Sequence, residues 1–132
     1  MSVLLYSAEK KAAGQRIQRV LEVLVAEERR EIYRTIEDVA IRLRRPVYDI
    51  DVAILLAITR EELRLMMPLR ELLDDVRIIL VLPDRGRDTI AKGHSLRPRF
   101  LTYADSDFVD VGAVLGRMLE KSKPAERVGG QR

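Results

Sequence analysis

The sequence predicts an α/β fold: a doubly wound, parallel, five-stranded sheet in the order 2-1-3-4-5, covered by helices on both faces. Two observations predict it. Apolar runs of strand length alternate five times with segments that have helical periodicity. Several of these runs are apolar at almost every position, which is typical of parallel strands buried on both faces. Right-handed crossovers leave few other arrangements for five such units.

Five apolar runs are predicted as strands. Residues 51–58 and 77–82 are apolar at almost every position, and residues 3–7 and 99–104 are runs of the same kind. Residues 30–35 are more polar, and such a composition is typical of a strand at the edge of a sheet. The chain therefore supplies one strand for each predicted helix.

The first two helices are predicted from apolar stripes. Residues 9–26 carry one buried stripe with spacing i, i+4, i+7, i+8 and i+11. Its members are Ala13, Ile17, Val20, Leu21 and Leu24. Residues 36–45 form the second helix, with Thr35 as its N-cap and Pro46 as its stop. Its buried face comprises Ile36, Val39, Ala40 and Leu43.

Caps and helix breakers mark the third and fourth helices. Thr59 and Glu62 form a capping box at the start of the third helix. Pro68 lies inside its pattern and is expected to kink it or divide it into two short pieces. Residues 87–96 predict a short fourth helix that is interrupted by Gly93.

The fifth helix closes the predicted domain. It is expected over residues 108–121, with Ser106 as its N-cap. Its buried face comprises Phe108, Val111, Val114, Leu115, Met118 and Leu119. Residues 122–132 have no apolar periodicity and are predicted to be a disordered tail. One domain over residues 1–121 fits the length of 132 residues.

The composition limits the chemistry that the chain can perform. It has no cysteine, so it has no disulfide, thiolate nucleophile or cysteine-bound metal. Its one histidine, His94, rules out a multi-histidine metal site and has no nucleophile signalled as its partner. His94 is expected on the surface or at a helix end. We therefore predict no enzyme activity, no catalytic residue, no metal and no cofactor.

Charge and hydropathy argue against nucleic acid and membrane as partners. The net charge is +3 and charged residues make up 34% of the chain, which is typical of a solvated, salt-bridged surface. Only six aromatic residues occur, so base stacking is poorly supported even if the arginines formed one basic surface. Those arginines are Arg29, Arg30, Arg42, Arg44, Arg45, Arg97 and Arg99. No apolar run approaches the ~20 residues of a membrane span, and no basic segment precedes the first strand, so we expect a cytoplasmic protein.

Four of the predicted strands resemble those of response-regulator receiver domains, a family with the flavodoxin-like fold. The stretch Val3-Leu4-Leu5-Tyr6-Ser7-Ala8-Glu9 is similar to the family's first strand, and residues 51–56, 77–83 and 100–104 are similar to its third, fourth and fifth strands. Residues 15–22 resemble its first helix. The resemblance spans residues 2–121 and implies a role in two-component signal transduction.

The first and third strands end differently from the family pattern. Receiver domains carry two acidic residues where Ser7 and Ala8 stand, so that only Glu9 keeps an acid. Their phosphoacceptor aspartate ends the third strand, where this chain has Leu56, or Ala57 if the register shifts by one. A methyl or isobutyl side chain cannot carry a phosphoryl group or coordinate Mg²⁺.

The fourth and fifth strands depart from the family pattern as well. Leu82 stands where the family has threonine or serine, and Tyr103 and Ala104 stand where it has lysine and proline. The resemblance therefore implies a degenerate receiver-like signalling domain that works by protein–protein contact without aspartyl phosphorylation.

The family dimerises and binds partners through its fourth helix, fifth strand and fifth helix. The resemblance places a candidate interface on this face, and a second copy of the chain is one candidate partner. The residues expected there are Arg87, Asp88, Lys92, Tyr103, Arg117 and Glu120. An ordinary solvated surface is the competing interpretation.

The strand ends also allow a small-ligand function. Nucleotides bind open α/β sheets in the crevice at the carboxyl ends of the strands, here the first and third. The residues beside that crevice are Ser7, Glu9, Thr59 and Asp84. A nucleotide-type ligand module or enzyme is the alternative function, and a domain cut from a larger regulator is a third.

Charged residues near the strand ends have two interpretations each. An acidic mouth could include Glu9, Asp84, Asp105 and Asp107, although loop and cap roles are the favoured reading. Residues 83–86 form a turn that could line a ligand site. Lys10, Lys11 and Arg16 could meet an anion, but solvent-facing positions are expected for them.

Overall fold

A computed structural model describes residues 2–121 of the chain. Five parallel strands form one sheet in the order β2-β1-β3-β4-β5, so the predicted strand order is confirmed. The strands are β1 (Ser2–Tyr6), β2 (Arg30–Tyr33), β3 (Ile50–Leu56), β4 (Ile78–Leu82) and β5 (Phe100–Tyr103). The polar strand β2 lies at an edge, as its composition predicts. The predicted tail, residues 122–132, lies outside the described residues.

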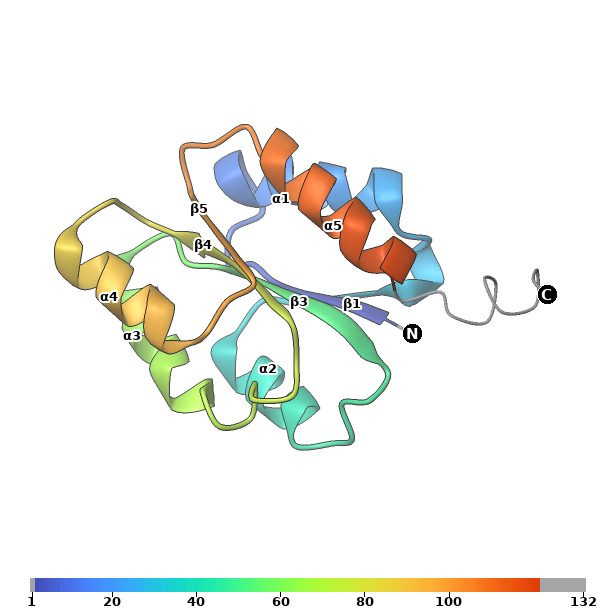
Figure 1. The fold of residues 1–132 in the computed structure, drawn as a ribbon, viewed down its shortest axis with the longest axis horizontal. Helices are drawn as coiled ribbons and strands as arrows, with labels where there is room; N and C mark the ends of the chain where they lie inside the picture. Colours follow the sequence, from blue (N-terminus) through green and yellow to red (C-terminus); the bar gives the residue numbers. More distant parts are fainter. Residues whose placement is uncertain (1, 122–132) are drawn as a thin grey trace.

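Five helices cover the sheet in two layers (Figure 1). They are α1 (Ala12–Leu24), α2 (Ile36–Leu43), α3 (Arg60–Met66), α4 (Arg87–Ser95) and α5 (Val109–Lys121). Helices α1 and α5 lie on one face, and α2, α3 and α4 lie on the other. This is a three-layer, flavodoxin-like α/β fold. Within residues 2–121, no helix is both long and apolar enough to cross a membrane.

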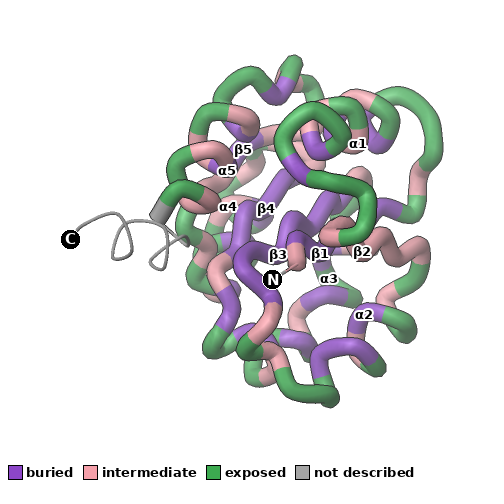
Figure 2. Tube along the Cα trace, turned by 90° about the vertical axis from the view of Figure 1, so that its right-hand side faces the viewer, coloured by how far each residue is buried: buried purple, intermediate pink, exposed green. Residues whose placement is uncertain are grey.

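Alternating side chains along the strands build two separate cores. In β1, Leu4 and Tyr6 face the layer of α2, α3 and α4, whereas Val3 and Leu5 face α1 and α5. The same alternation continues through β3 and β4, because successive side chains of a strand point to opposite faces. Figure 2 shows buried residues along the central strands and exposed residues on the outer turns.

The predicted caps and the predicted division at Pro68 are present. The Thr35 hydroxyl accepts a hydrogen bond from the Asp38 N–H at 3.0 Å, and the Thr59 hydroxyl accepts one from the Glu62 N–H at 3.1 Å. Helix α3 ends at Met66 and is followed by the 3₁₀ helix η2 (Met67–Leu69). A second 3₁₀ helix, η1 (Glu27–Arg29), precedes β2.

The prediction for the first helix is wrong at both ends. Helix α1 begins at Ala12 rather than at residue 9, because the chain first forms a loop in which Ala12 has a φ of 52°. At the other end Leu24 is 40% exposed, although its position places it on the buried stripe. Val25 enters the core instead, since the helix ends at Leu24 and the backbone becomes extended at the next residue.

One further prediction of helix structure is wrong, and one is confirmed. Gly93 does not interrupt α4; it lies within the helix and lets it approach the sheet, since a Cβ atom there would lie 3.0 Å from a Leu82 methyl carbon. Helix α5 spans Val109–Lys121, in agreement with the predicted start at about Phe108. Ser106 accepts a hydrogen bond from the Phe108 N–H, and Asp107 accepts one from the Val109 N–H.

Candidate functional site

Buried side chains close the carboxyl edge of the sheet at the positions where receiver domains carry their phosphorylation site. Ser7 follows β1, and Leu56 and Leu82 end β3 and β4; all three are 0% exposed. Leu56 belongs to the core beneath α1 and α5, and Leu82 to the core on the opposite face. Ala57, the other candidate for the phosphoacceptor position, is also 0% exposed. These positions contribute packing.

The loop after β1 is closed by its own hydrogen bonds. The Ser7 hydroxyl donates to the Glu9 carbonyl oxygen at 2.7 Å, and the Glu9 carboxylate accepts from the Gly14 N–H at 3.5 Å. Gly14 packs directly against this turn, where a Cβ atom would lie 1.9 Å from the Glu9 carbonyl oxygen. The Ala8 side chain is exposed and carries no polar group. Any larger residue at Gly14 would therefore force the loop open.

Two arginines bind backbone carbonyls near the carboxyl ends of the strands, one after β1 and one after β5. Arg34, which follows β2, donates to the Ser7 carbonyl at 3.1 Å and to the Gln18 side chain at 3.3 Å. Arg16 on α1 donates to the Ala104 carbonyl at 2.6 Å and to the Ser106 carbonyl at 3.2 Å. The expectation that Arg16 faces solvent is therefore wrong.

The acidic residues near the strand ends form no joint site. Asp84 accepts from Arg60 at 2.8 Å and from the Gly86 N–H, and these hydrogen bonds hold the pKa of its carboxyl below the ordinary value. Asp105 pairs with Arg85 at 2.9 Å. Within residues 2–121, no group of three or more histidine, aspartate or glutamate side chains could hold a metal ion.

A buried phenol and a carboxylate meet beside the end of β1. The Tyr6 hydroxyl donates to Glu62 at 2.9 Å, while the other Glu62 oxygen accepts from the Ile58 N–H at 2.8 Å. Burial raises the pKa of Tyr6 above its ordinary value, and the Glu62 carboxylate raises it further. The predicted capping box is therefore altered, because the Glu62 side chain binds the N–H of Ile58 rather than that of Thr59.

The predicted interface residues lie around the edge strand β5. Arg87 and Lys92 are exposed on α4, and Arg117 and Glu120 are exposed on α5. Helices α4 and α5 cover opposite faces of the sheet on either side of β5 (Figure 1). Tyr103 ends β5, and the Arg85 guanidinium lies 4.2 Å from the centre of its ring. His94 is exposed on α4, as expected.

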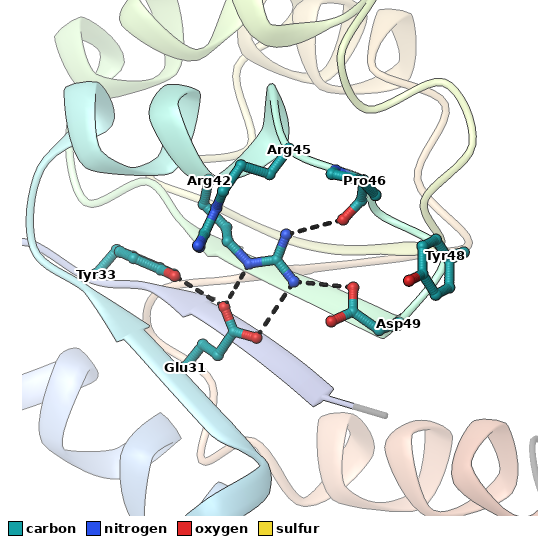
Figure 3. A pocket seen from close by; sticks show the side chains of 7 residues that line it. All are labelled: Glu31, Tyr33, Arg42, Arg45, Pro46, Tyr48 and Asp49. Carbon is teal, nitrogen blue, oxygen red and sulfur yellow. Dashed lines mark hydrogen bonds and ion pairs between the residues drawn. The ribbon is translucent and has the colours of Figure 1, made fainter.

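A polar pocket that the sequence did not predict lies near the amino ends of β1 and β3. Its volume is about 450 Å³. Figure 3 shows Arg42 of α2 at its centre, donating to Glu31 at 2.7 Å, to Asp49 at 2.9 Å and to the Pro46 carbonyl at 3.1 Å. The Tyr33 hydroxyl donates to the same Glu31 carboxylate at 2.8 Å. Arg42 is thus held from several sides.

The charges in this pocket stabilise one another. Burial alone would raise the pKa of Glu31, but hydrogen bonds from Arg42 and Tyr33 bring it below its ordinary value. Hydrogen bonds to Glu31 and Asp49 raise the pKa of the Arg42 guanidinium. Only 5% of the Arg42 side chain is exposed, so the hypothesis of one basic surface that includes this residue is wrong.

Other arginines of that hypothetical surface are paired with acids. Arg29 lies 3.3 Å from Asp51, and Arg30 lies 3.8 Å from Glu22. Both arginines therefore have an acidic partner.

Comparison with known proteins supports the fold and no more. A crystal structure of a protein from Burkholderia pseudomallei, which its name describes as pilus assembly-related, matches with a TM-score of 0.62 and 16% sequence identity. The match covers 89% of this chain and 88% of that one. At such low identity the likeness shows a shared fold. No protein-family model matches the sequence, and no curated protein is similar to it.

Proposed function

We propose that the chain is a degenerate, receiver-like signalling module that acts through protein–protein contact without aspartyl phosphorylation. The observation that carries this proposal is the burial of Ser7, Leu56 and Leu82, each 0% exposed, at the ends of three neighbouring strands. Receiver chemistry needs carboxylates that hold a divalent cation and an aspartate that attacks phosphorus. None of these three side chains can perform either task, whereas the fold that presents interaction surfaces is retained.

The candidate contact surface is the face formed by α4, β5 and α5. Exposed charges of both signs border β5, an edge strand with open backbone groups. A second copy of the chain is the first partner to test, since a twofold contact needs only one such face. Sedimentation equilibrium of the parent chain and of Arg117→Glu measures this. A weaker dimer in the variant supports the face, with Arg19→Glu on α1 as the matched control.

The phosphorylation part of the proposal has its own experiment. Beryllofluoride with Mg²⁺ imitates the phosphoryl group that a receiver aspartate carries. We expect no change in the amide spectrum of the protein on adding it, because Leu56 and Ala57 offer no acceptor oxygen. Stoichiometric binding of the mimic, with shifts confined to the strand ends, would overturn the proposal.

The alternative of a nucleotide-type ligand at the strand ends has a separate test. A ligand at about 100 times its dissociation constant stabilises a protein by about 2.7 kcal/mol. Such a gain is visible as a rise in the melting temperature. A panel of nucleotides and flavins that leaves the melting temperature unchanged supports the interaction module over the ligand module.

A further inference from the structure

An apolar groove separates helices α2 and α3 on the sheet face opposite α1 and α5. Its volume is about 490 Å³, and its exposed lining is mainly apolar. The walls and floor include Tyr6, Ile36, Ala40, Leu65, Leu69 and Leu72. Leu65 is 44% exposed, so the groove has an open apolar rim. The groove lies away from the face of α4, β5 and α5.

Each wall of the groove is one face of a helical segment. Ile36, Ala40 and Arg44 recur every four residues along α2, and Leu65, Leu69 and Leu72 recur at i, i+4 and i+7 along α3 and the turns that follow it. Both helices are crossovers between parallel strands and therefore run in the same direction. Two parallel apolar stripes with a gap between them are the geometry that receives an amphipathic helix.

Three charged side chains line this groove, and one of them, Glu62, already accepts hydrogen bonds from the Tyr6 hydroxyl and the Ile58 N–H. The other two stand near opposite ends of α2. Glu37 and Arg44 both line the groove, and they are seven residues apart on the same face of α2. Their backbones are therefore separated by about 10 Å along the helix, too far for them to pair with each other. Neither side chain forms a salt bridge to any other residue within 2–121.

We propose that this groove binds a short amphipathic helix of a partner protein that runs antiparallel to α2. The charges determine the direction. An antiparallel helix places its first turn beside Arg44 and its last turn beside Glu37. The dipole of a helix favours acidic residues in its first turn and basic residues in its last turn. In the antiparallel orientation these residues lie beside Arg44 and Glu37, which carry the opposite charges. The apolar contacts supply the affinity, and the two charges supply the orientation.

This inference rests on the proposed interaction module and names a surface and a class of partner for it. The beryllofluoride experiment tests phosphorylation alone, so the two ideas fail separately. A groove about two turns long accommodates apolar side chains at i, i+3 and i+7 of the partner. The partner motif is therefore acidic at its start, apolar along one face and basic at its end.

The probe is a synthetic, lactam-bridged helical peptide of about 14 residues, a length that presents three apolar anchors. It has glutamate in its first turn, leucine at three positions spaced i, i+3 and i+7, and lysine in its last turn. A second peptide has the two charged ends exchanged, and a third has serine for leucine. Fluorescence anisotropy gives the affinities, and amide chemical shifts give the binding site.

We expect the first peptide to shift amides of residues 36–44 and 62–72 and to bind about threefold more tightly than the exchanged peptide. Leu65→Ser should weaken binding about tenfold, because a leucine anchor loses its apolar contact. Ile41→Ser is the matched control, since Ile41 is also exposed on α2 (58%) but does not line the groove. The double variant Glu37→Lys/Arg44→Glu should reverse the preference between the two peptides.

Three results would overturn the proposal. The first is the absence of groove shifts at millimolar peptide, or shifts that map only to α4, β5 and α5. The second is equal loss of binding in Leu65→Ser and Ile41→Ser. The third is a dimer of the parent chain that Leu65→Ser dissociates, because the occupant of the groove would then be a second copy.

Discussion

Ion pairs near the amino ends of the strands (the amino edge) are buried, whereas ion pairs near the carboxyl ends (the carboxyl edge) are exposed. Near the amino edge, Arg42 has a side chain that is 5% exposed and is bound by two carboxylates and a carbonyl. At the carboxyl edge, Arg60 pairs with Asp84 and Arg85 pairs with Asp105, but both arginine side chains are at least 60% exposed. The same kind of ion pair is thus part of the interior at one edge and part of the solvated surface at the other.

This difference indicates which charges belong to the fold. A buried cation whose acidic partners are removed cannot recover its hydration, whereas an exposed one exchanges its partner for water. The amino-edge network therefore ties α2 and the loop before β3 to β2. The carboxyl-edge pairs cover strand ends that hydrophobic packing has already closed, and they are free to rearrange when another molecule binds.

Removing the buried Arg42 should cause the larger loss of stability in this comparison. Arg42→Ala leaves Glu31 and Asp49 as partly buried carboxylates without their cation, and we expect the free energy of unfolding to fall by about 2–3 kcal/mol. Urea unfolding followed by circular dichroism measures this. Arg44→Ala, at an exposed position two residues later, is the control and should change little. A loss below about 1 kcal/mol for Arg42→Ala would show that the network contributes no more than a surface pair.

The sequence predicts the apolar packing at the carboxyl edge better than the ion-pair network at the amino edge. The continuous apolar runs at 51–58 and 77–82 predict helices on both faces of the sheet, because each face of those strands must be covered. The strand order follows from the right-handed crossovers. The sequence alone shows that Leu56 and Leu82 are apolar, and the structure places both in the core. What those positions imply for phosphorylation stays a prediction.

The Arg42 network is hidden from the sequence because its members come from separate elements. Glu31 is 11 residues before Arg42 and Asp49 is seven after it, and nothing local pairs them. One signal was present: Arg42 lies beside Leu43 and three residues after Val39, at the border of the stripe that the helix buries. A charged residue at such a border is either extended to solvent or matched by acids from another element.

Gly93 and Arg16 are two residues for which contacts distant in the sequence override the local expectation. Gly93 is a helix breaker by local propensity, yet contact with Leu82 decides its role and α4 continues through it. Arg16 is a surface cation by composition, yet the carbonyls of Ala104 and Ser106 bind it from 88 and 90 residues away. Local rules fail where a residue's closest partner is distant in the chain.

Acid should weaken the network of Arg42, Glu31 and Asp49. Hydrogen bonds lower the pKa of Glu31 and of Asp49, so their ionised forms stabilise the fold above the unfolded-state pKa. That contribution is lost as the pH falls below about 4 and through the folded-state pKa. The free energy of unfolding, measured from about pH 6 to about pH 3, should therefore fall less steeply in Glu31→Gln than in the parent chain. Glu61→Gln removes an exposed partner of Arg64 and should change the slope less than Glu31→Gln does, because solvent screens that pair. Identical slopes in all three chains would contradict this.

The smallest effect is expected at the carboxyl edge. Arg85→Ala removes the ion pair to Asp105 and the guanidinium over the Tyr103 ring, but both partners already contact solvent and can hydrate. The urea midpoint of this variant should match that of the parent chain, while Arg42→Ala in the same series shifts clearly. The ring-proton chemical shifts of Tyr103 show whether the stacked guanidinium has been lost, so that an unchanged midpoint can be assigned to the removal of this contact. A midpoint shift for Arg85→Ala as large as that for Arg42→Ala would contradict the distinction between the two edges. The exposure of an ion pair would then not determine how much it stabilises the fold.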